Sequence, residues 1–168
     1  MMIFCLLDRA TVYRQVCIAF DMLDQLGLTD TWRLRFSATR LGSLLLINKI
    51  KRVLEEAGYR FPLQAARTIV RFAVDYHPDL RTAPREDLVD WIYGLGMKLA
   101  SMFLARTRPE EGPYAILDRH LHRWLERHGC TLPRSDYLGR ERFFLDWCTE
   151  RELDPVDYDL EIWERSRI

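Results

Sequence analysis

Apolar residues recur at helical spacing through most of this chain. Within residues 11–27 they fall on roughly one stripe, formed by Val12, Val16, Ile18, Ala19, Met22 and Leu23. The same spacing returns in later stretches, which span residues 37–58, 61–78, 82–94, 98–106, 118–129, 135–151 and 155–166. No run alternates convincingly as a strand would, and the β-rich windows 68–74 and 142–147 fit a helix equally well. The pattern therefore predicts an all-α fold of about eight short helices.

Polar and glycine residues mark the expected ends of several helices. Ser37 and Thr82 stand at the start of two apolar stretches, where a hydroxyl side chain can cap a helix. Gly27, Gly58 and Gly94 follow apolar stretches, and glycine commonly ends a helix because it adopts a positive φ without a steric cost.

Composition excludes a disordered chain but says little about a partner. Apolar residues make up 48% of the 168 positions, which is enough for a packed core. The formal net charge is zero, yet residues 31–71 hold nine basic residues against Glu55 and Glu56. Residues 141–168 hold nine acidic residues against four arginines. Two interpretations stay open: a basic face that meets phosphate, or two ordinary solvated helix faces of opposite sign.

Cysteine and histidine spacing gives no sign of a metal or an iron–sulfur cluster. The cysteines are widely scattered, at Cys5, Cys17, Cys130 and Cys148, and we expect them to be reduced thiols of a cytoplasmic protein. His120 and His122 stand two apart on an expected helix and point to different faces, which disfavours a shared metal ion. The apolar start, residues 1–7, is too short for a signal peptide or a membrane span. We expect no cofactor.

Residues 85–106 predict two helices joined by a short turn. Gly94 and Gly96 bracket the turn, which we expect to be too tight for ordinary side chains. Glycines leave backbone N–H groups free to face a phosphate, and the positive end of the second helix adds to that attraction. Many helix pairs are joined in this way without any nucleic acid. For the whole segment we favour a helix-hairpin-helix that binds DNA.

Lys98 lies in the first turn of the second helix, and the chain has only two other lysines, Lys49 and Lys51. The helix dipole disfavours a cation at that position, so we expect its proton to be held less tightly. A neutral lysine amine can attack a sugar carbon and form a Schiff base. A lysine that only contacts phosphate explains the position equally well.

Asp118 favours the first of these two interpretations. It stands directly before an apolar face formed by Leu121, Trp124 and Leu125, which predicts a helix N-cap. The loop of residues 107–117 can return this cap toward Lys98. A carboxylate there can help to take the proton of the lysine and can stabilise positive charge on a sugar ring.

The segment of residues 94–125, "GLGMKLASMFLA…YAILDRHLHRWL", resembles the helix-hairpin-helix (HhH-GPD) DNA glycosylase superfamily, whose signature is a hairpin lysine followed by an aspartate. It is most similar to the small archaeal-type 8-oxoguanine glycosylase/lyases, the second Ogg class. The stretches "GYRFPLQAARTIV" and "LDPVDYDLEIW" resemble the same family in the same order, so the likeness covers most of the chain.

The resemblance implies a bifunctional DNA N-glycosylase and AP lyase that excises an oxidised purine, most simply 8-oxoguanine, during base excision repair. It implies Lys98 as the Schiff-base nucleophile and Asp118 as its catalytic partner. Phe61 and Trp163 map to the aromatic residues that sandwich the flipped base, with Asp159 as a polar contact. Contacts with double-stranded DNA are expected from Gly94, Gly96, Met97, Arg106, Arg119 and His120.

The departures from the family concern recognition more than catalysis. We expect the family's leading segment and its lysine-terminated tail to be missing, and Gln64 and Ala65 stand where relatives tend to carry basic residues. These departures leave two alternatives open. One is a non-catalytic module that binds DNA or a partner. The other is the same chemistry on another modified base, in DNA or RNA, in an anti-phage setting.

We expect one glycosylase domain over residues 1–168, with a cleft between two helical lobes. The first lobe is predicted at residues 15–106, including the hairpin of residues 85–106. The second combines residues 1–14 with residues 107–168. A protein partner that replaces the leading segment is a further expectation, as is a cytoplasmic location at the nucleoid.

Overall fold

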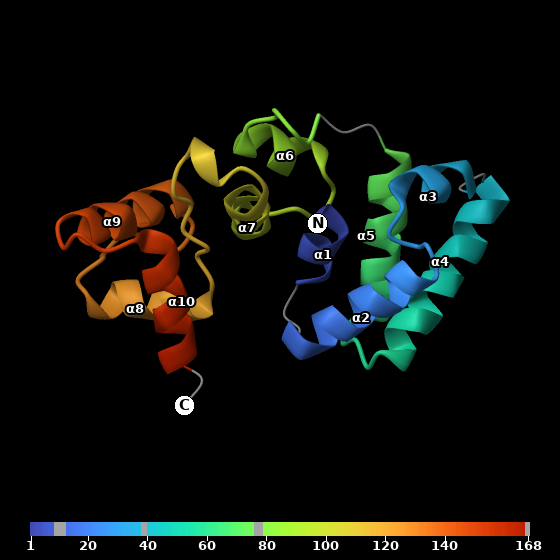
Figure 1. The fold of residues 1–168 in the computed structure, drawn as a ribbon, viewed down its shortest axis with the longest axis horizontal. Helices are drawn as coiled ribbons and strands as arrows, with labels where there is room; N and C mark the ends of the chain where they lie inside the picture. The colour runs from blue at the N-terminus through green and yellow to red at the C-terminus, as the bar shows by residue number, and fades with distance from the viewer. Residues whose placement is uncertain (9–12, 38–39, 76–78, 167–168) are drawn as a thin grey trace. The chain divides into compact units, whose positions relative to one another are not determined.

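The computed structural model describes residues 1–8, 13–37, 40–75 and 79–166, and all regular structure in these ranges is helical (Figure 1). The all-α prediction is confirmed. The described residues form ten α-helices and one 3₁₀ helix, more than the eight expected, because the first apolar segment and residues 31–37 form short helices of their own.

The contacts divide the chain into two compact units, residues 1–95 and residues 96–168. The N-terminal unit contains α1 (Met2–Leu7), α2 (Tyr13–Gln25), α3 (Thr31–Ser37), α4 (Arg40–Glu56), α5 (Pro62–Val74) and α6 (Arg85–Trp91). The C-terminal unit contains α7 (Met97–Thr107), η1 (Pro109–Glu111), α8 (Arg119–Arg127), α9 (Tyr137–Thr149) and α10 (Pro155–Arg165).

The predicted lobes differ from these units in where they place α1 and α7. Within the N-terminal unit, α1 packs against α2 and α5, and the Tyr59 hydroxyl donates a hydrogen bond to the carbonyl oxygen of Leu7. Burial of Ile3, Leu6 and Leu7 explains this position, because an isolated six-residue helix has no stability of its own. The N-terminal residues are therefore part of the core of this unit.

The helix ends predicted from glycine are confirmed, whereas the helix starts predicted from hydroxyl residues are wrong. Gly27, Gly58 and Gly94 all have positive φ values (66°, 70° and 81°) after the helices that they were expected to end. Ser37 is instead the last residue of α3, and α6 begins after Pro84 rather than Thr82. Glycine is specific because φ > 0 is costly for other residues, whereas a hydroxyl residue is tolerated in many positions.

Helix α5 is the central helix of the N-terminal unit, in contact with α1, α3 and α4 (Figure 1). Ala65, Ala66, Ile69 and Ala73 are buried along it, and the small side chains let neighbouring helices approach closely. Pro62 occupies its first turn, where the missing N–H has no intrahelical partner in any case. The buried body of α5 thus fixes the position of its N-terminal end, which begins after Phe61.

Helix α2 confirms only part of its predicted stripe. Val16, Ala19 and Leu23 are fully buried, whereas Ile18 is 40% exposed and was wrongly predicted to face the core. Val12 lies outside the described residues.

The C-terminal unit is built around a cluster of apolar residues from α8, α9 and α10. Leu121, Leu125, Phe144 and Cys148 are fully buried in it. Aromatic rings surround this centre: Trp124 meets Trp147 edge-on at 4.7 Å between centroids. Burial raises the pKa of the Cys148 thiol to about 11, with the nearby Asp154 and Asp159 acting in the same direction.

Arg140 lies inside this unit, with a side chain that is only 2% exposed. Its guanidinium donates to the carbonyl oxygens of Leu132 at 2.8 Å and of His122 at 2.9 Å. Glu126 lies 3.5 Å away and also receives a two-pronged hydrogen bond from the exposed Arg134. A buried guanidinium is stable only when such acceptors surround it.

No helix in the described ranges combines the length and apolar character that a bilayer crossing requires. The four cysteines are free thiols, and Cys5, Cys130 and Cys148 are buried.

Replacement of Arg140 by methionine is expected to lower the free energy of unfolding by about 2–4 kcal/mol, because it leaves buried carbonyl groups without their donor. Urea denaturation followed by circular dichroism measures this loss. The matched variant Arg134→Met removes an exposed arginine that binds the same glutamate, and its effect should be much smaller. Equal losses in the two variants would contradict the structural role given to Arg140.

Candidate active site

The turn between α6 and α7 begins with a hydrogen bond from the N–H of Leu95 to the carbonyl oxygen of Ile92, at 3.0 Å. Gly94 within it has a φ of 81°, which an L-residue with a side chain rarely adopts. Two helices and a short turn therefore stand where residues 85–106 predicted them. Glycine is required at position 94 by the backbone conformation.

Gly96 is not required for the reason that the sequence suggested. It is the N-cap residue of α7 with a φ of −94°, and a side-chain carbon added there would meet no atom within 4 Å. The expectation of a crowded turn at Gly96 is therefore wrong. The space where a side chain would start at Gly96 is open.

Lys98 is the second residue of α7 and is partly buried. Residues 99–104 behind it are all buried, and they include the polar Ser101, which is fully buried. Burial of these residues fixes the position of α7. Lys98 precedes Ser101 by about one helical turn.

Asp118 is the N-cap of α8, as its sequence position predicted. Its Oδ1 accepts hydrogen bonds from the N–H groups of His120 at 2.7 Å and Leu121 at 2.9 Å. The apolar face of Leu121 and Leu125 is buried, so α8 is fixed and its cap is fixed with it. Both backbone hydrogen bonds go to one carboxylate oxygen, so the cap does not use Oδ2.

The three residues before Asp118 are held by side chains from elsewhere in the unit. The N–H of Ala115 donates to Oε1 of Glu141 at 3.1 Å, and the N–H of Ile116 donates to Oδ2 of Asp159 at 3.3 Å. The N–H of Leu117 donates to the hydroxyl of Tyr137 at 3.3 Å. This segment belongs to no helix or sheet, so the three side chains accept the hydrogen bonds that its N–H groups would otherwise lack.

Tyr137 also connects the segment to α7. Its hydroxyl donates to the carbonyl oxygen of Ala115 at 2.8 Å and lies 3.1 Å from Oγ of Ser101. Ser101 follows Lys98 by three residues on α7. One hydroxyl therefore bonds both the helix that carries Lys98 and the backbone that leads to Asp118.

Asp159 shares the electrostatic environment of Lys98 and Asp118. Burial raises the pKa of its carboxyl to about 7, the hydrogen bond from Ile116 lowers it, Asp118 raises it further and Lys98 lowers it. Groups affect each other's pKa in this way only at short range inside a protein. The Lys98 amine and the Asp118 carboxylate therefore both lie within electrostatic range of Asp159 in the C-terminal unit.

Trp163 stands one helical turn after Asp159 on α10 and is partly buried. Arg106 is exposed in the last turn of α7, and Arg119 is exposed at the start of α8. His120 is partly buried and accepts a hydrogen bond from Nε of Arg119 at 3.1 Å, while Met97, the first residue of α7, is partly buried.

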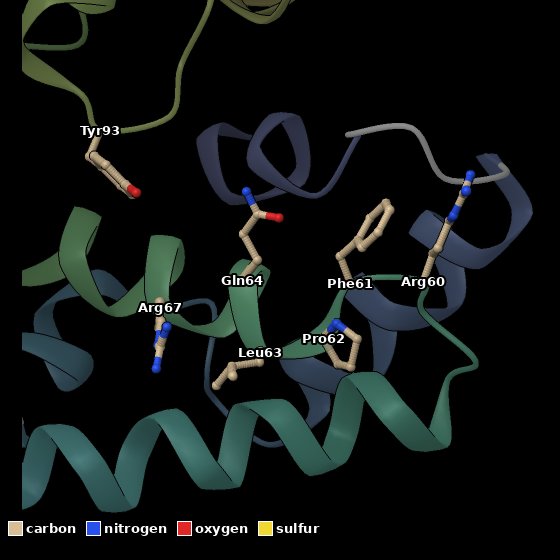
Figure 2. A pocket seen from close by; sticks show the side chains of 7 residues that line it. All are labelled: Arg60, Phe61, Pro62, Leu63, Gln64, Arg67 and Tyr93. Carbon is tan, nitrogen blue, oxygen red and sulfur yellow. The ribbon is translucent and has the colours of Figure 1, made fainter.

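Phe61 belongs to the N-terminal unit, where it is 42% exposed at the N-cap position of α5. It lines a hollow of about 410 Å³ together with Arg60, Pro62, Leu63, Gln64, Arg67 and Tyr93 (Figure 2). The guanidinium of Arg60 lies 5.0 Å from the centre of the Phe61 ring. An exposed aromatic ring beside such a hollow can stack against another flat group.

Tyr137, Glu141 and Ser101 support the site although no sequence pattern marked them. Each acts through a contact with a residue at least 20 positions away, so no local spacing marks it. Within the described residues, no group of three His, Cys, Asp or Glu side chains could hold a metal ion.

The raised pKa of Asp159 predicts how stability depends on pH. Between about pH 4 and pH 7 the unfolded chain loses this proton while the folded chain retains it, so the free energy of unfolding should fall as pH rises and then level off. Asp159→Asn should abolish this contribution and stabilise the protein at pH 8 by roughly 1–3 kcal/mol. Denaturation at a series of pH values measures the slope. Asp146→Asn, an exposed change on α9, should retain the wild-type slope, and an unchanged slope in Asp159→Asn would refute the assignment.

Comparison with known proteins gives one consistent family. The family model described as 8-oxoguanine DNA glycosylase (Ogg-HhH) matches residues 38–153. An 8-oxoguanine DNA glycosylase/AP lyase of Thermoplasma volcanium is 32% identical, over 95% of this chain and 75% of its own length. The protein of the same name from Thermoplasma acidophilum is 32% identical, over 68% of this chain and 60% of its own length.

A solved structure agrees with these relatives. The crystal structure of the 8-oxoguanine DNA glycosylase of Thermotoga maritima matches with a TM-score of 0.71 and 25% sequence identity. The match covers 96% of this chain and 76% of that one. The family match spans most of the chain and includes the hairpin, Lys98 and Asp118. This chain belongs to the 8-oxoguanine DNA glycosylase family.

Proposed function

We propose that this protein is a DNA glycosylase with AP-lyase activity that removes 8-oxoguanine from double-stranded DNA. Two facts support the proposal: the relatives that match over most of the chain carry this name, and an amine and two carboxyl groups gather in the C-terminal unit. The observation that carries it is the match to relatives of this name over most of the chain, in a segment that includes Lys98 and Asp118, because the chemistry needs a nucleophile and a carboxylate.

DNA is held at its phosphates by the start of α7. The open space beside Gly96 admits a phosphate oxygen to the backbone N–H groups of Gly96 and Met97, after the turn that Gly94 forms. The exposed Arg106 and Arg119, with His120 next to the latter, add positive charge that attracts the strand.

The damaged base leaves the duplex and stacks against aromatic rings. By their likeness to the family's aromatic residues we assign Phe61 and Trp163 to this stacking, and Asp159 to a polar contact. Stacking suits this task because a flipped purine must replace the contacts that it loses in the helix.

Lys98 carries out the substitution at the sugar. Its neutral amine attacks C1′, the bond from C1′ to the base breaks, and the base leaves with the bonding electron pair and takes up a proton. Loss of the amine protons and opening of the sugar ring give an imine between Nζ and C1′. Removal of a proton from C2′ then expels the 3′ phosphate, and water releases the lysine from the product.

Asp118 assists through its position. Its Oδ1 is fixed by two backbone N–H groups, so Oδ2 can accept a proton from the amine and stabilise positive charge as the base departs. The protein partner expected from the sequence stays a prediction.

Lys98→Gln should abolish the covalent adduct that borohydride traps between the protein and an 8-oxoguanine duplex, because an amide cannot form an imine. Gel electrophoresis of the trapped product measures the adduct. Lys49→Gln, which removes an exposed lysine of α4, should trap like the wild type. Normal trapping by Lys98→Gln would remove Lys98 from the mechanism.

A panel of lesion-bearing duplexes tests the substrate in the same assay. Adduct formation with another modified base but not with 8-oxoguanine would show the same chemistry on a different substrate. Salt-dependent binding without an adduct on any lesion would support the non-catalytic alternative.

Tyr137→Phe should slow base release roughly tenfold, because it removes the hydroxyl that joins Ser101 of α7 to the segment before Asp118. Single-turnover kinetics at saturating enzyme measure the rate, and fluorescence anisotropy should give an unchanged affinity for DNA. Tyr158→Phe is the matched control, since that ring packs in the same unit against Trp147. A wild-type rate in Tyr137→Phe would contradict the connecting role.

A further inference from the structure

The hollow beside Phe61 contains side chains that the proposed chemistry leaves without a role. Gln64 and Tyr93 both line it, and Tyr93 is 52% exposed. Figure 2 shows the Gln64 side chain between Phe61 and Tyr93, with its amide on the side toward which the Phe61 ring points. Arg67, one turn further along α5, points the opposite way (Figure 2).

Phe61 and Gln64 lie close together at the start of α5. Phe61 is the N-cap and Gln64 is the third residue of the helix, and Figure 2 shows the two side chains on the same side. The first turn is secured by the bond from the N–H of Ala65 to the carbonyl oxygen of Phe61, at 3.0 Å. A flat molecule stacked on the Phe61 ring therefore presents an edge to the Gln64 amide.

The far side of the hollow is held in place as well. The guanidinium of Arg71 lies 4.2 Å from the centre of the Tyr93 ring, and its Nε donates to Asp75 at 2.7 Å. This arrangement limits the movement of Tyr93. The part of the chain that the structure describes supplies no hydrogen-bond partner for the Gln64 amide, so its donor and its acceptor are both available to a ligand.

A carboxamide can distinguish guanine from its C8-oxidised form. Guanine presents two acceptors, N7 and O6, on its major-groove edge, so an amide oxygen finds no donor there and is repelled by N7. Oxidation at C8 places a hydrogen on N7 and a carbonyl oxygen on C8. That edge offers one donor and one acceptor side by side, which match the oxygen and the NH₂ group of a glutamine.

We infer that Gln64 is a specificity-determining residue, whose amide pairs with the N7–H and the C8 carbonyl of an oxidised purine stacked on Phe61. The inference rests on the function proposed above and adds to it the edge by which the base is recognised. A neutral amide makes this selection where a basic side chain could not, because a cation donates to the N7 of guanine as readily as to the C8 carbonyl.

The test compares affinities for two lesions that share this edge. Gln64→Leu is prepared in the Lys98→Gln background, so that binding is measured without turnover. Fluorescence anisotropy gives the dissociation constants for duplexes that contain 8-oxoguanine, 8-oxoadenine or undamaged guanine. The preference for 8-oxoguanine over guanine should fall about tenfold, as expected for one lost bidentate pair, with little change for guanine itself. The affinity for 8-oxoadenine, which carries the same N7–H and C8 carbonyl, should fall by the same factor.

Gln25→Leu, an exposed glutamine at the end of α2, is the matched control and should retain the full preference. Unchanged discrimination in Gln64→Leu would overturn the inference, and so would a loss confined to 8-oxoguanine, since the amide would then read the six-membered ring. Borohydride trapping by the wild type is scored separately. An adduct together with unchanged discrimination refutes only the role of Gln64, whereas no adduct on any lesion refutes the proposed function as well.

Discussion

Three consecutive backbone N–H groups before Asp118 determine the geometry of the C-terminal unit. Residues 115–117 lie between α7 and α8 without a helical partner, and an unpaired buried N–H is costly. Glu141, Asp159 and Tyr137 each satisfy one of them. Because these acceptors come from α9 and α10, the position of Asp118 depends on helices that begin 19 and 37 residues later. The two N-cap hydrogen bonds then fix the Asp118 carboxylate relative to α8.

Helix α9 supplies most of this support from one face. Tyr137, Arg140 and Glu141 are spaced three and four residues apart, so they project together. Arg140 holds the carbonyl groups of α8 and of the loop after it, while Tyr137 and Glu141 hold the segment before α8. Polar residues of α9 thus hold the segments that precede and follow α8. Asp159 accepts a hydrogen bond from the segment before α8, and its pKa is also lowered by the charge of Lys98.

The sequence predicted those features that local rules control. Asp118 was identified because an aspartate directly before an apolar face is a strong N-cap signal, and Gly94 because its backbone conformation excludes other residues. The tight packing expected at Gly96 was wrong, since nothing occupies the space beside it. Tyr137 and Glu141 were missed because their partners lie 20 and 26 residues away, and a single sequence carries no record of such pairs. Gln64 drew attention only as a departure from relatives, and its relation to Tyr93 required the fold.

The buried thiol of Cys148 has a consequence for where such a protein can work. Only the thiolate reacts readily with peroxides, and a pKa of about 11 leaves almost none of it at neutral pH. Cys5 and Cys130 are likewise enclosed by packed side chains. The same oxidants that attack guanine in DNA would therefore find few reactive sulfur atoms in this protein's interior, so its fold can survive the conditions that create its substrate.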